Sequence, residues 1–378
     1  MLTLPPLSLY VHIPWCERKC PYCDFNSHVS GQALPEADYI TKLLQNLEQQ
    51  LPWVQGRKLT SIFFGGGTPS LLAAQSIQRF LDEARNLLPF ADDIEITLEA
   101  NPGSSEQEKF AALHAAGVNR LSLGIQSFHD QQLQALGRIH CAEEALNAVS
   151  AAQQAGFQRI NIDLMHGLPG QTLATAMGDL QQAIATGVEH ISWYQLTIEQ
   201  NTEFFRYPPP LPDEEVLIDI HDAGSQLLAE QGFGQYEISA FCRTGQMARH
   251  NLNYWQYGDY LAVGAGAHGK ITLPEENRIL RFNNTRLPKD YLSRDIHFHT
   301  GLEAVDGQDR LFECLMNCLR LKNGMPVADC LAYTGQSRQN LLSLCQPLVT
   351  DGLLQLDSNI KTTALGYRHL NSVLENLL

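Results

Sequence analysis

Residues 7–23 read LSLYVHIPWCERKCPYC, an apolar run that leads directly into three closely spaced cysteines. The first seven residues have the Val, Ile and Leu content of a buried strand. Cys16, Cys20 and Cys23 would then lie on the loop that follows this strand. Thiolates grouped in this way are typical of a metal or iron–sulfur site. The stretch therefore predicts a strand whose carboxyl end carries chemistry.

The same pattern of short apolar runs and longer amphipathic segments continues to about residue 198. The expected strands are 7–13, 59–64, 94–98, 119–125, 158–164 and 190–198. The expected helices are 36–51, 71–87, 104–116, 141–155 and 172–186. Repeated strand and helix units of this kind predict an α/β fold around a parallel sheet. Six such units are expected.

The rest of the chain has a different pattern. Prolines within 207–212 predict a rigid linker, because they can neither continue a helix nor donate to a sheet. A helix from Asp213 and a strand at 236–241 should follow, and residues 245–300 show no clear pattern. From about Asp309, three helices, two short strands and a last helix predict a winged-helix-like module. The expected domains are 1–206 with the cofactor site, 207–305 as linker and bridging segment, and 306–378 as the C-terminal module.

Composition excludes several classes of protein. The 378 residues carry 26 Lys and Arg against 41 Asp and Glu, a net charge of −15, which argues against nucleic-acid binding. The candidate recognition helix at 337–351 carries one arginine, which gives no support for DNA reading. No apolar run is long enough to span a bilayer, and the first nine residues lack the features of a signal peptide. We therefore expect a cytoplasmic protein that is not an integral membrane protein. Its nine cysteines are not expected to form a disulfide framework.

Two interpretations of the cysteine triad are open from the residues alone. Three thiolates can hold three irons of a [4Fe–4S] cluster and leave the fourth iron without a protein ligand. A structural zinc ion is the alternative, with His12 or His28 completing a Cys₃His site. The spacing favours the cluster.

Polar and glycine residues follow several of the predicted strands. In barrels of parallel strands, functional residues gather at the carboxyl ends. GGGTP at 65–69 follows the second strand, and its missing side chains would let backbone carbonyls approach an ammonium group. Glu99, Gln126 and Asp163 offer acceptors for ribose hydroxyls or an ammonium, while Arg138 offers a fork for a carboxylate. Each of these residues alone could be an ordinary surface or capping residue. Together they indicate a binding site.

The triad spacing, with Tyr22 before its last cysteine, resembles the signature of the radical S-adenosylmethionine (SAM) family. The match covers roughly residues 1–200. It implies a partial (β/α)₆ barrel and a [4Fe–4S] cluster held by Cys16, Cys20 and Cys23. In this family SAM chelates the open iron, and one electron from the cluster cleaves it to methionine and a 5′-deoxyadenosyl radical.

The strand-end residues are similar to the SAM-site residues of oxygen-independent coproporphyrinogen III dehydrogenases and their close relatives, and the resemblance extends into the C-terminal module. The cofactor-binding residues it implies are Tyr10, Gly66, Gly67, Thr68, Glu99, Gln126, Arg138 and Asp163. The methionine end of SAM is expected near Gly66, Thr68 and Arg138, and its ribose near Gln126 and Asp163. The dehydrogenases have a further cysteine two positions after the triad, whereas Asp24 and Phe25 follow Cys23 here. This difference argues against decarboxylase activity.

HNLNYW at 250–255 resembles the HNxxYW motif of the HemW branch, whose members are haem chaperones. A neutral imidazole such as that of His250 can bind haem iron, while Tyr254 and Trp255 can stack on the porphyrin. Arg243 and Arg249 could meet the propionates. The alternative is that His250 and Tyr254 are neighbours on a packed helix face. Cys314 and Cys318 have the same four-residue spacing and are expected in the core.

We conclude from the sequence that a haem chaperone of the radical SAM family is favoured. It would bind a [4Fe–4S] cluster, SAM and haem, and would transfer haem to an acceptor protein that the sequence does not identify. A homodimer is left open. A radical enzyme that decarboxylates coproporphyrinogen III is the main alternative, so enzymatic activity is left open, and a zinc-stabilised binding module is the third interpretation.

Overall fold

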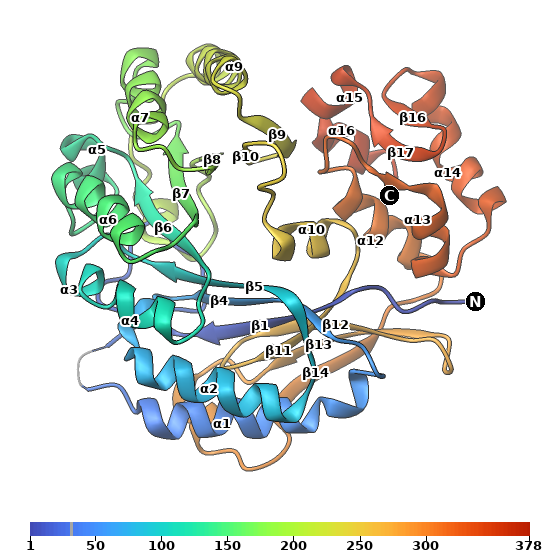
Figure 1. Ribbon diagram of the computed structural model, residues 1–378. Coiled ribbons are helices and arrows are strands. Elements are labelled where there is room, and N and C mark those ends of the chain that lie inside the picture. Colours follow the sequence, from blue (N-terminus) through green and yellow to red (C-terminus); the bar gives the residue numbers. More distant parts are fainter. Residues whose placement is uncertain (31–32) are drawn as a thin grey trace.

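The computed structural model describes residues 1–30 and 33–378. Its central feature is a curved sheet whose middle consists of parallel strands (Figure 1). These strands are β1 (Leu7–Ile13), β4 (Leu59–Gly66), β5 (Phe90–Ala100), β6 (Arg120–Gln126), β7 (Arg159–His166) and β8 (His190–Gln195). Each pairs in parallel with the next one in the chain, so the six predicted strands and the parallel sheet are confirmed.

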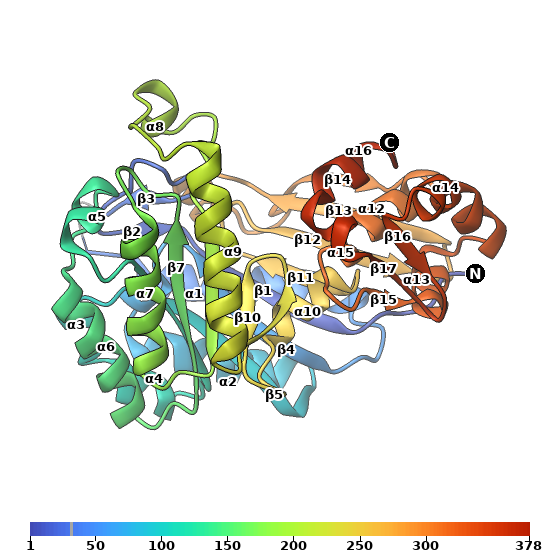
Figure 2. The same cartoon turned by 90° about the horizontal axis from the view of Figure 1, so that it is seen from above.

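The connecting helices lie on one side of this curved sheet (Figures 1 and 2). They are α1 (Glu36–Gln49), α2 (Ala74–Leu87), α3 (Ser104–Gln107), α4 (Phe110–Ala115), α5 (Asp130–Ala135), α6 (Ala142–Gln154) and α7 (Leu173–Ala185), with short 3₁₀ turns η1 (Leu51–Trp53) and η2 (Pro69–Leu71). The single helix expected at 104–116 is two helices in the structure. Between them Lys109 Nζ donates to the Ser70 and Leu71 carbonyls, which ties this junction to η2.

Strands from the middle of the chain extend the sheet at both edges. They are β9 (Gly234–Glu237), β10 (Ala240–Cys242), β11 (Asp259–Val263), β12 (His268–Leu273), β13 (Arg278–Asn284) and β14 (His299–Ala304). The full order is β14-β13-β12-β11-β1-β4-β5-β6-β7-β8-β10-β9. The single strand expected at 236–241 is therefore wrong: the chain turns after Glu237, and β10 pairs antiparallel with both β9 and β8.

The helices of this middle segment are α8 (Glu203–Arg206), α9 (Glu214–Glu230), α10 (Arg249–Trp255) and α11 (Pro288–Leu292). Asp213 caps α9 as expected, because its Oδ1 accepts a hydrogen bond from Val216 N at 3.0 Å. No helix or strand occupies 207–212.

The C-terminal segment forms a separate group of elements beside the sheet (Figures 1 and 2). They are α12 (Asp309–Cys318), β15 (Met325–Pro326), α13 (Val327–Thr334), α14 (Arg338–Thr350), β16 (Leu354–Leu356), β17 (Asn359–Thr362), α15 (Ala364–Arg368) and α16 (Leu370–Glu375). The three strands form a sheet in the order β15-β17-β16. Cys314 and Cys318 are fully buried, which confirms them as core residues.

Two large apolar clusters hold these parts together. The larger lies between the sheet and its covering helices. The smaller joins the C-terminal helices to Leu2, Tyr257, Ile279 and Val305 from outside that segment. The division into three domains stays a prediction. In the part of the chain that the structure describes, no helix is both long and apolar enough to cross a membrane.

Candidate functional site

The three cysteines follow β1 closely: Cys16 ends the two-residue strand β2 (Trp15–Cys16), and Cys20 and Cys23 lie on the loop after it. This loop is closed by its own hydrogen bonds: Cys23 N donates to the Cys20 carbonyl at 3.1 Å, and the Lys19 side chain donates through Nζ to the Phe25 carbonyl at 3.2 Å. The thiols of Cys16, Cys20 and Cys23 are free and half-buried. All three line one cavity, so the loop presents them to a shared space.

That cavity, which we call the cluster cavity, has a volume of about 670 Å³. It collects the residues that the sequence predicts at successive strand ends. Those that line it are Cys16, Cys20, Cys23, Gly66, Gly67, Thr68, Glu99, Gln126, Arg138 and Asp163. Of the predicted site residues, Tyr10 lines a neighbouring cavity, and His250 is not among the lining residues of either one.

Arg138 connects the cysteine loop with the strand ends. Its Nη2 donates to Asn101 Oδ1 at 2.7 Å and to the Gly124 carbonyl at 2.6 Å, while Nη1 lies 3.5 Å from Cys20 Sγ. Asn101 in turn donates to Thr68 Oγ1 at 3.1 Å. Arg138 Nε is buried without a partner among the described residues. A guanidinium held in place with a free donor fits the carboxylate-binding role expected for this residue.

The ends of β6 and β7 place an amide and a carboxylate on the cavity wall. Ser122 Oγ and Asn161 Nδ2 donate to the two oxygens of Asp163 at 2.9 and 2.8 Å. Burial raises the pKa of Asp163, and these donors oppose the rise. Gln126 has a φ of 71°, which is uncommon for a residue with a side chain, and its Oε1 accepts a hydrogen bond from Tyr194 at 2.9 Å. Both polar groups are therefore fixed before any ligand arrives.

Glu99 lies between the cluster cavity and its neighbour and lines both. Its Oε2 accepts a hydrogen bond from Gly66 N at 3.2 Å. Burial and the negative charge of Asp163 raise the pKa of Glu99 to about 8. Glu99 is thus mainly protonated at neutral pH, and an ammonium group beside it would favour its ionised form.

The glycine loop packs against the end of β1. Gly66 has a φ of 110°, and a Cβ there would overlap the His12 ring. Gly67 N donates to the Ile13 carbonyl and Thr68 N to the Trp15 carbonyl, both at 2.7 Å. The sequence predicts that these glycines let backbone carbonyls approach an ammonium group. The structure adds a second reason, because side chains here would separate β4 from the cysteine loop.

The zinc alternative requires His12 or His28 beside the cysteines. Within residues 1–30 and 33–378, no three His, Cys, Asp or Glu side chains, the three cysteines included, already lie close enough together to hold a metal ion. His12 is engaged elsewhere: Nδ1 lies 2.7 Å from the Tyr10 hydroxyl and Nε2 lies 2.9 Å from the Asn26 carbonyl. Burial raises the pKa of both Cys16 and Cys23, and a cationic metal centre bound to these thiols would favour their thiolate form.

The HNLNYW motif lies in helix α10, and its side chains face different surroundings. Asn251 and Trp255 line the cluster cavity, and Tyr254 lines the neighbouring cavity. The His250 ring stacks on Phe63 with centroids 4.3 Å apart and planes 5° apart. The sequence permits two roles for His250, haem ligand or packed neighbour, and in the structure its ring is packed against Phe63. Its role in haem binding stays a prediction.

His250 and the two arginines expected at the haem propionates, Arg243 and Arg249, have further contacts that involve charged groups. His250 Nδ1 lies 3.3 Å from Glu95 Oε1, and burial lowers the pKa of this imidazole although Glu95 opposes the shift. Arg249 pairs with Asp93 at 2.9 Å, and Arg243 lies over the Phe233 ring. These two arginines are thus engaged with protein groups.

Two residues at the cluster cavity, Glu237 and Arg320, were not singled out by the sequence, and Trp255 of the HNLNYW motif lies beside Arg320. Glu237 Oε2, Trp255 Nε1 and Arg320 Nε are buried without partners in the described part of the chain. The Arg320 guanidinium lies 4.4 Å above the Trp255 ring. Glu237 and Arg320 meet because Glu237 forms a β-bridge with Leu321, and no local motif encodes such a long-range pairing. The C-terminal module therefore contributes to the cavity wall.

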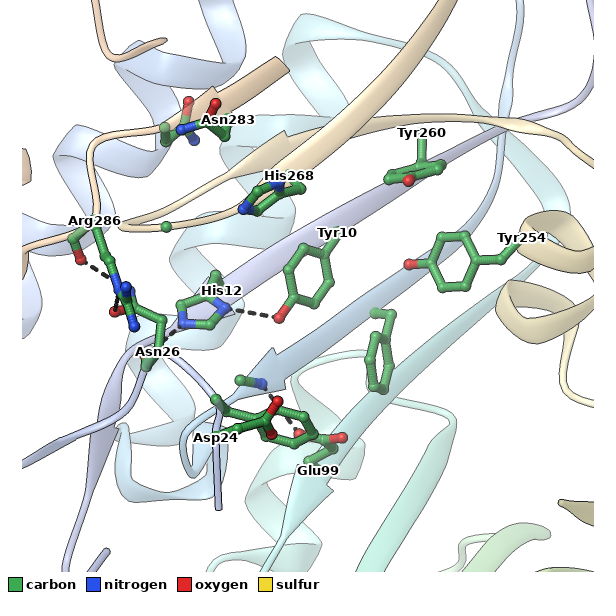
Figure 3. Close-up of a pocket in the computed structure, with 15 residues that line it drawn as sticks. Tyr10, His12, Asp24, Asn26, Glu99, Tyr254, Tyr260, His268, Asn283 and Arg286 are labelled. Atoms are coloured by element: carbon green, nitrogen blue, oxygen red, sulfur yellow. Dashed lines mark hydrogen bonds between the residues drawn. The ribbon is translucent and has the colours of Figure 1, made fainter. Parts of the chain in front are cut away.

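The second cavity, which we call the aromatic cavity, has a volume of about 570 Å³ (Figure 3). Its walls include the rings of Tyr10, Phe63, Tyr254 and Tyr260, and His268 and Arg286 also line it. It shares Asp24, Phe25, Gly66 and Glu99 with the cluster cavity, so the two spaces adjoin. Tyr260 and Arg286 lie in the segment that sequence patterns left unassigned.

Comparisons with known proteins agree with this geometry. Residues 10–183 match the Radical SAM superfamily and residues 305–369 match the HemN C-terminal domain. A protein from Haemophilus influenzae described as "Heme chaperone HemW" is 53% identical over 342 residues, which are 89% of this chain and 88% of the relative. One of the same description from Escherichia coli is 46% identical over 379 residues, the full length of both chains. The chain belongs to the HemW family of radical SAM proteins.

This membership confirms both resemblances inferred from the cysteine triad and from the HNLNYW motif. A solved structure of coproporphyrinogen III oxidase (HemN) from Escherichia coli superposes with a TM-score of 0.83, covering 99% of this chain and 90% of that chain. The sequence identity is 24%, so the likeness concerns the fold. The HemW family chain thus has the radical SAM architecture expected from its strands.

Proposed function

We propose that this chain is a haem chaperone that holds a [4Fe–4S] cluster and SAM and passes haem to an acceptor protein. The observation that carries the proposal is that three free thiols and the strand-end polar residues converge on one cavity. The names of the full-length relatives support the carrier role. Their name also supports the existence of an acceptor, whose identity the chain does not disclose.

Cys16, Cys20 and Cys23 would hold the cluster. They are free, share one cavity and lie on a loop whose backbone is already closed, so binding needs little further ordering. When bound, the cluster would supply an open iron for SAM and one electron for reductive cleavage. Arg138 Nη1 lies 3.5 Å from Cys20 Sγ, so its positive charge would lie beside the bound cluster.

SAM would lie across the strand ends. The free Nε of Arg138 can donate a hydrogen bond to the methionine carboxylate. Glu99 has a raised pKa, and it can lose its proton and pair as a carboxylate with the ammonium group of SAM. Gln126 and Asp163 supply oriented acceptors for the ribose hydroxyls. Gly66, Gly67 and Thr68 line the cluster cavity together with the cysteines, and Tyr10 lines the adjoining aromatic cavity together with Glu99.

Haem is the cargo in this proposal, and its binding would depend on the α10 motif. Tyr254 lines the aromatic cavity, and His250 packs against Phe63 in the wall of the same cavity. A porphyrin needs apolar faces to stack against, which aromatic rings supply. His250 and Tyr254 should therefore both influence haem affinity.

The competing function is radical decarboxylation of coproporphyrinogen III, which the shared fold permits. The position of the additional cysteine of the dehydrogenases is Phe25 here, and its side chain is exposed at the boundary of the two cavities. Phenylalanine can neither ligate iron nor transfer a proton. This observation favours the carrier over the catalyst.

The test is anaerobic purification of the cluster-loaded protein, followed by separate additions of haem and of coproporphyrinogen III with SAM and a reductant. We expect saturable haem uptake at one haem per chain and no protoporphyrinogen. A second expected result is transfer of that haem to an added haem-free acceptor protein. Protoporphyrinogen formation at a rate proportional to protein concentration would overturn the proposal in favour of the dehydrogenase.

A further inference from the structure

We propose that haem occupies the aromatic cavity, with His268 as the iron ligand and Arg286 as a partner of a propionate. This inference rests on the proposed function and specifies where the cargo lies. The aromatic cavity is lined by β1, β4, α10 and the β11–β13 extension. It is therefore distinct from the cluster cavity, although the two adjoin.

The walls suit a flat aromatic ligand. Tyr10 and Phe63 stack with centroids 5.9 Å apart and planes 27° apart, and Tyr254 and Tyr260 meet edge to face at 4.9 Å. Figure 3 shows Tyr10, Tyr254 and Tyr260 facing one open space. The volume of about 570 Å³ lies within the usual range for small-molecule sites, roughly 300–1,000 Å³. Aromatic walls of this kind bind a porphyrin face through stacking and burial.

His268 is the histidine at this cavity that is free to bind a metal. His12 also lines the cavity, but both of its ring nitrogens have hydrogen-bonding partners. The His268 ring is exposed and makes no hydrogen bond with any described residue. The ring is nevertheless partly desolvated by the cavity wall, and this desolvation, together with the Arg281 charge, lowers the pKa of His268 and favours the neutral imidazole that ligates iron. His268, Tyr10 and Glu99 all line this cavity, and in Figure 3 His268 and Glu99 are seen on opposite sides of Tyr10.

Arg286 supplies positive charge at the rim of the same cavity. Its Nε donates to Asn26 Oδ1 at 3.2 Å, which fixes the side chain next to the cysteine loop. Arg286 forms no ion pair with a carboxylate of the described residues. Its remaining guanidinium donors can therefore pair with a propionate of a ligand in the cavity.

This location also gives His250 a defined role. The His250 ring lies flat on Phe63, and Phe63 forms part of the cavity wall. His250 is therefore a positioning residue: it holds an aromatic wall in place without touching the iron. Its removal should loosen porphyrin stacking, whereas removal of His268 should change iron ligation. The two histidines can thus be separated by experiment.

The experiment titrates haem, and separately metal-free protoporphyrin IX, into the cluster-loaded full-length protein without oxygen. His268→Ala should weaken haem affinity by at least about tenfold, shift the Soret difference spectrum, and leave protoporphyrin affinity unchanged, because only haem has iron to ligate. Added imidazole should restore the spectrum. His250→Ala should weaken the affinity for both porphyrins to a similar degree while the iron signature stays the same. His221→Ala is the matched control, an exposed histidine on α9 that lines neither cavity, and should match wild type.

His268→Gln provides a second variant of similar size, and far-UV circular dichroism with cluster content verifies folding. Identical haem spectra and affinities for wild type, His268→Ala and His268→Gln would overturn the assignment of the ligand. A changed iron signature in His250→Ala alone would also overturn it and would identify His250 as the ligand. If the wild-type protein took up no haem in a saturable manner, the proposed function would fail together with this assignment. If the wild-type protein took up haem and the His268 variants behaved identically, only the assignment of the iron ligand would fail.

Discussion

The surroundings of Glu99 in the site change the pKa of its carboxyl group. Its pKa is raised from 4.5 to about 8 by burial and by Asp163. Between these two pH values the folded protein keeps a proton that the unfolded chain has lost, so this group lowers stability as pH rises. Glu99→Gln removes the effect. We expect the variant to gain stability relative to wild type from pH 5 to pH 8, by at most about 1.4 kcal/mol per pH unit.

Urea denaturation of the cluster-free protein at several pH values measures this difference. Glu83→Gln is the control, because Glu83 is an exposed residue of α2 paired with Arg79. Its stability relative to wild type should not vary with pH over the same range. A Glu99→Gln difference that is independent of pH would contradict the raised pKa.

The cysteine triad makes the second prediction at this scale. Replacing Cys16, Cys20 and Cys23 together by Ser should remove almost all bound iron and acid-labile sulfide, because a serine hydroxyl does not replace a thiolate ligand. Chemical analysis of the reconstituted protein measures both. Cys141→Ser is the matched control: this cysteine begins α6, where serine is a favourable N-cap. Wild-type iron and sulfide in the triple variant would show that other residues hold the cluster.

At the scale of elements, the sequence predicted what local patterns encode. The strands β1 and β4 to β8 were found within a few residues, because buried parallel strands are continuous apolar runs. Residues 245–300 could not be assigned. Their strand β11 pairs with β1, and the two are separated by about 250 residues, so no local pattern specifies the pairing. The strand-end rule nevertheless predicted the lining of the cluster cavity, because it depends only on parallel strands.

The strand ends lead to a prediction for SAM. Gln126→Ala with Asp163→Ala removes the two polar groups expected at the ribose, and both already have fixed hydrogen bonds in the site. We expect SAM affinity of the cluster-loaded protein to fall by about tenfold or more, measured by isothermal titration calorimetry. Gln134→Ala with Asp92→Ala, both exposed and outside the cavity, is the control pair. Equal affinities for the first pair and wild type would disprove this placement of SAM.

The extension of the sheet depends on a buried ion cluster. Asp259 on β11 is fully buried and accepts hydrogen bonds from Lys270 Nζ at 2.9 Å and from Arg57 at 2.7 Å. Asp259→Ala leaves the Lys270 charge buried without its partner, which should cost about 3–5 kcal/mol of unfolding free energy. Asp295→Ala breaks an ion pair between Lys42 and an exposed carboxylate, and should cost much less stability than Asp259→Ala. Chemical denaturation compares the two, and equal costs would contradict this account.

At the scale of the whole molecule, the site combines segments that no sequence motif connects. The cysteine loop, α10 and the C-terminal module meet at the cluster cavity, where Arg320 lies over Trp255. The cysteine triad and the HNLNYW motif could be recognised in the sequence, because the residues of each motif follow one another at a characteristic spacing. Arg320 and Glu237 could not, because their meeting depends on how the module packs against β9.

The packing of that module leads to the last prediction. Leu315 of α12 is fully buried in the cluster that also contains Tyr257 and Ile279 of the sheet region. Leu315→Ala should therefore lower the free energy of unfolding by about 2–5 kcal/mol. Because the two regions share this cluster, hydrogen exchange should become faster in β13 as well as in α12. Leu365→Ala in the same module is the control, since this leucine is 53% exposed. Faster exchange confined to α12–α16 would show instead that the module opens by itself, in agreement with the separate domain expected from the sequence.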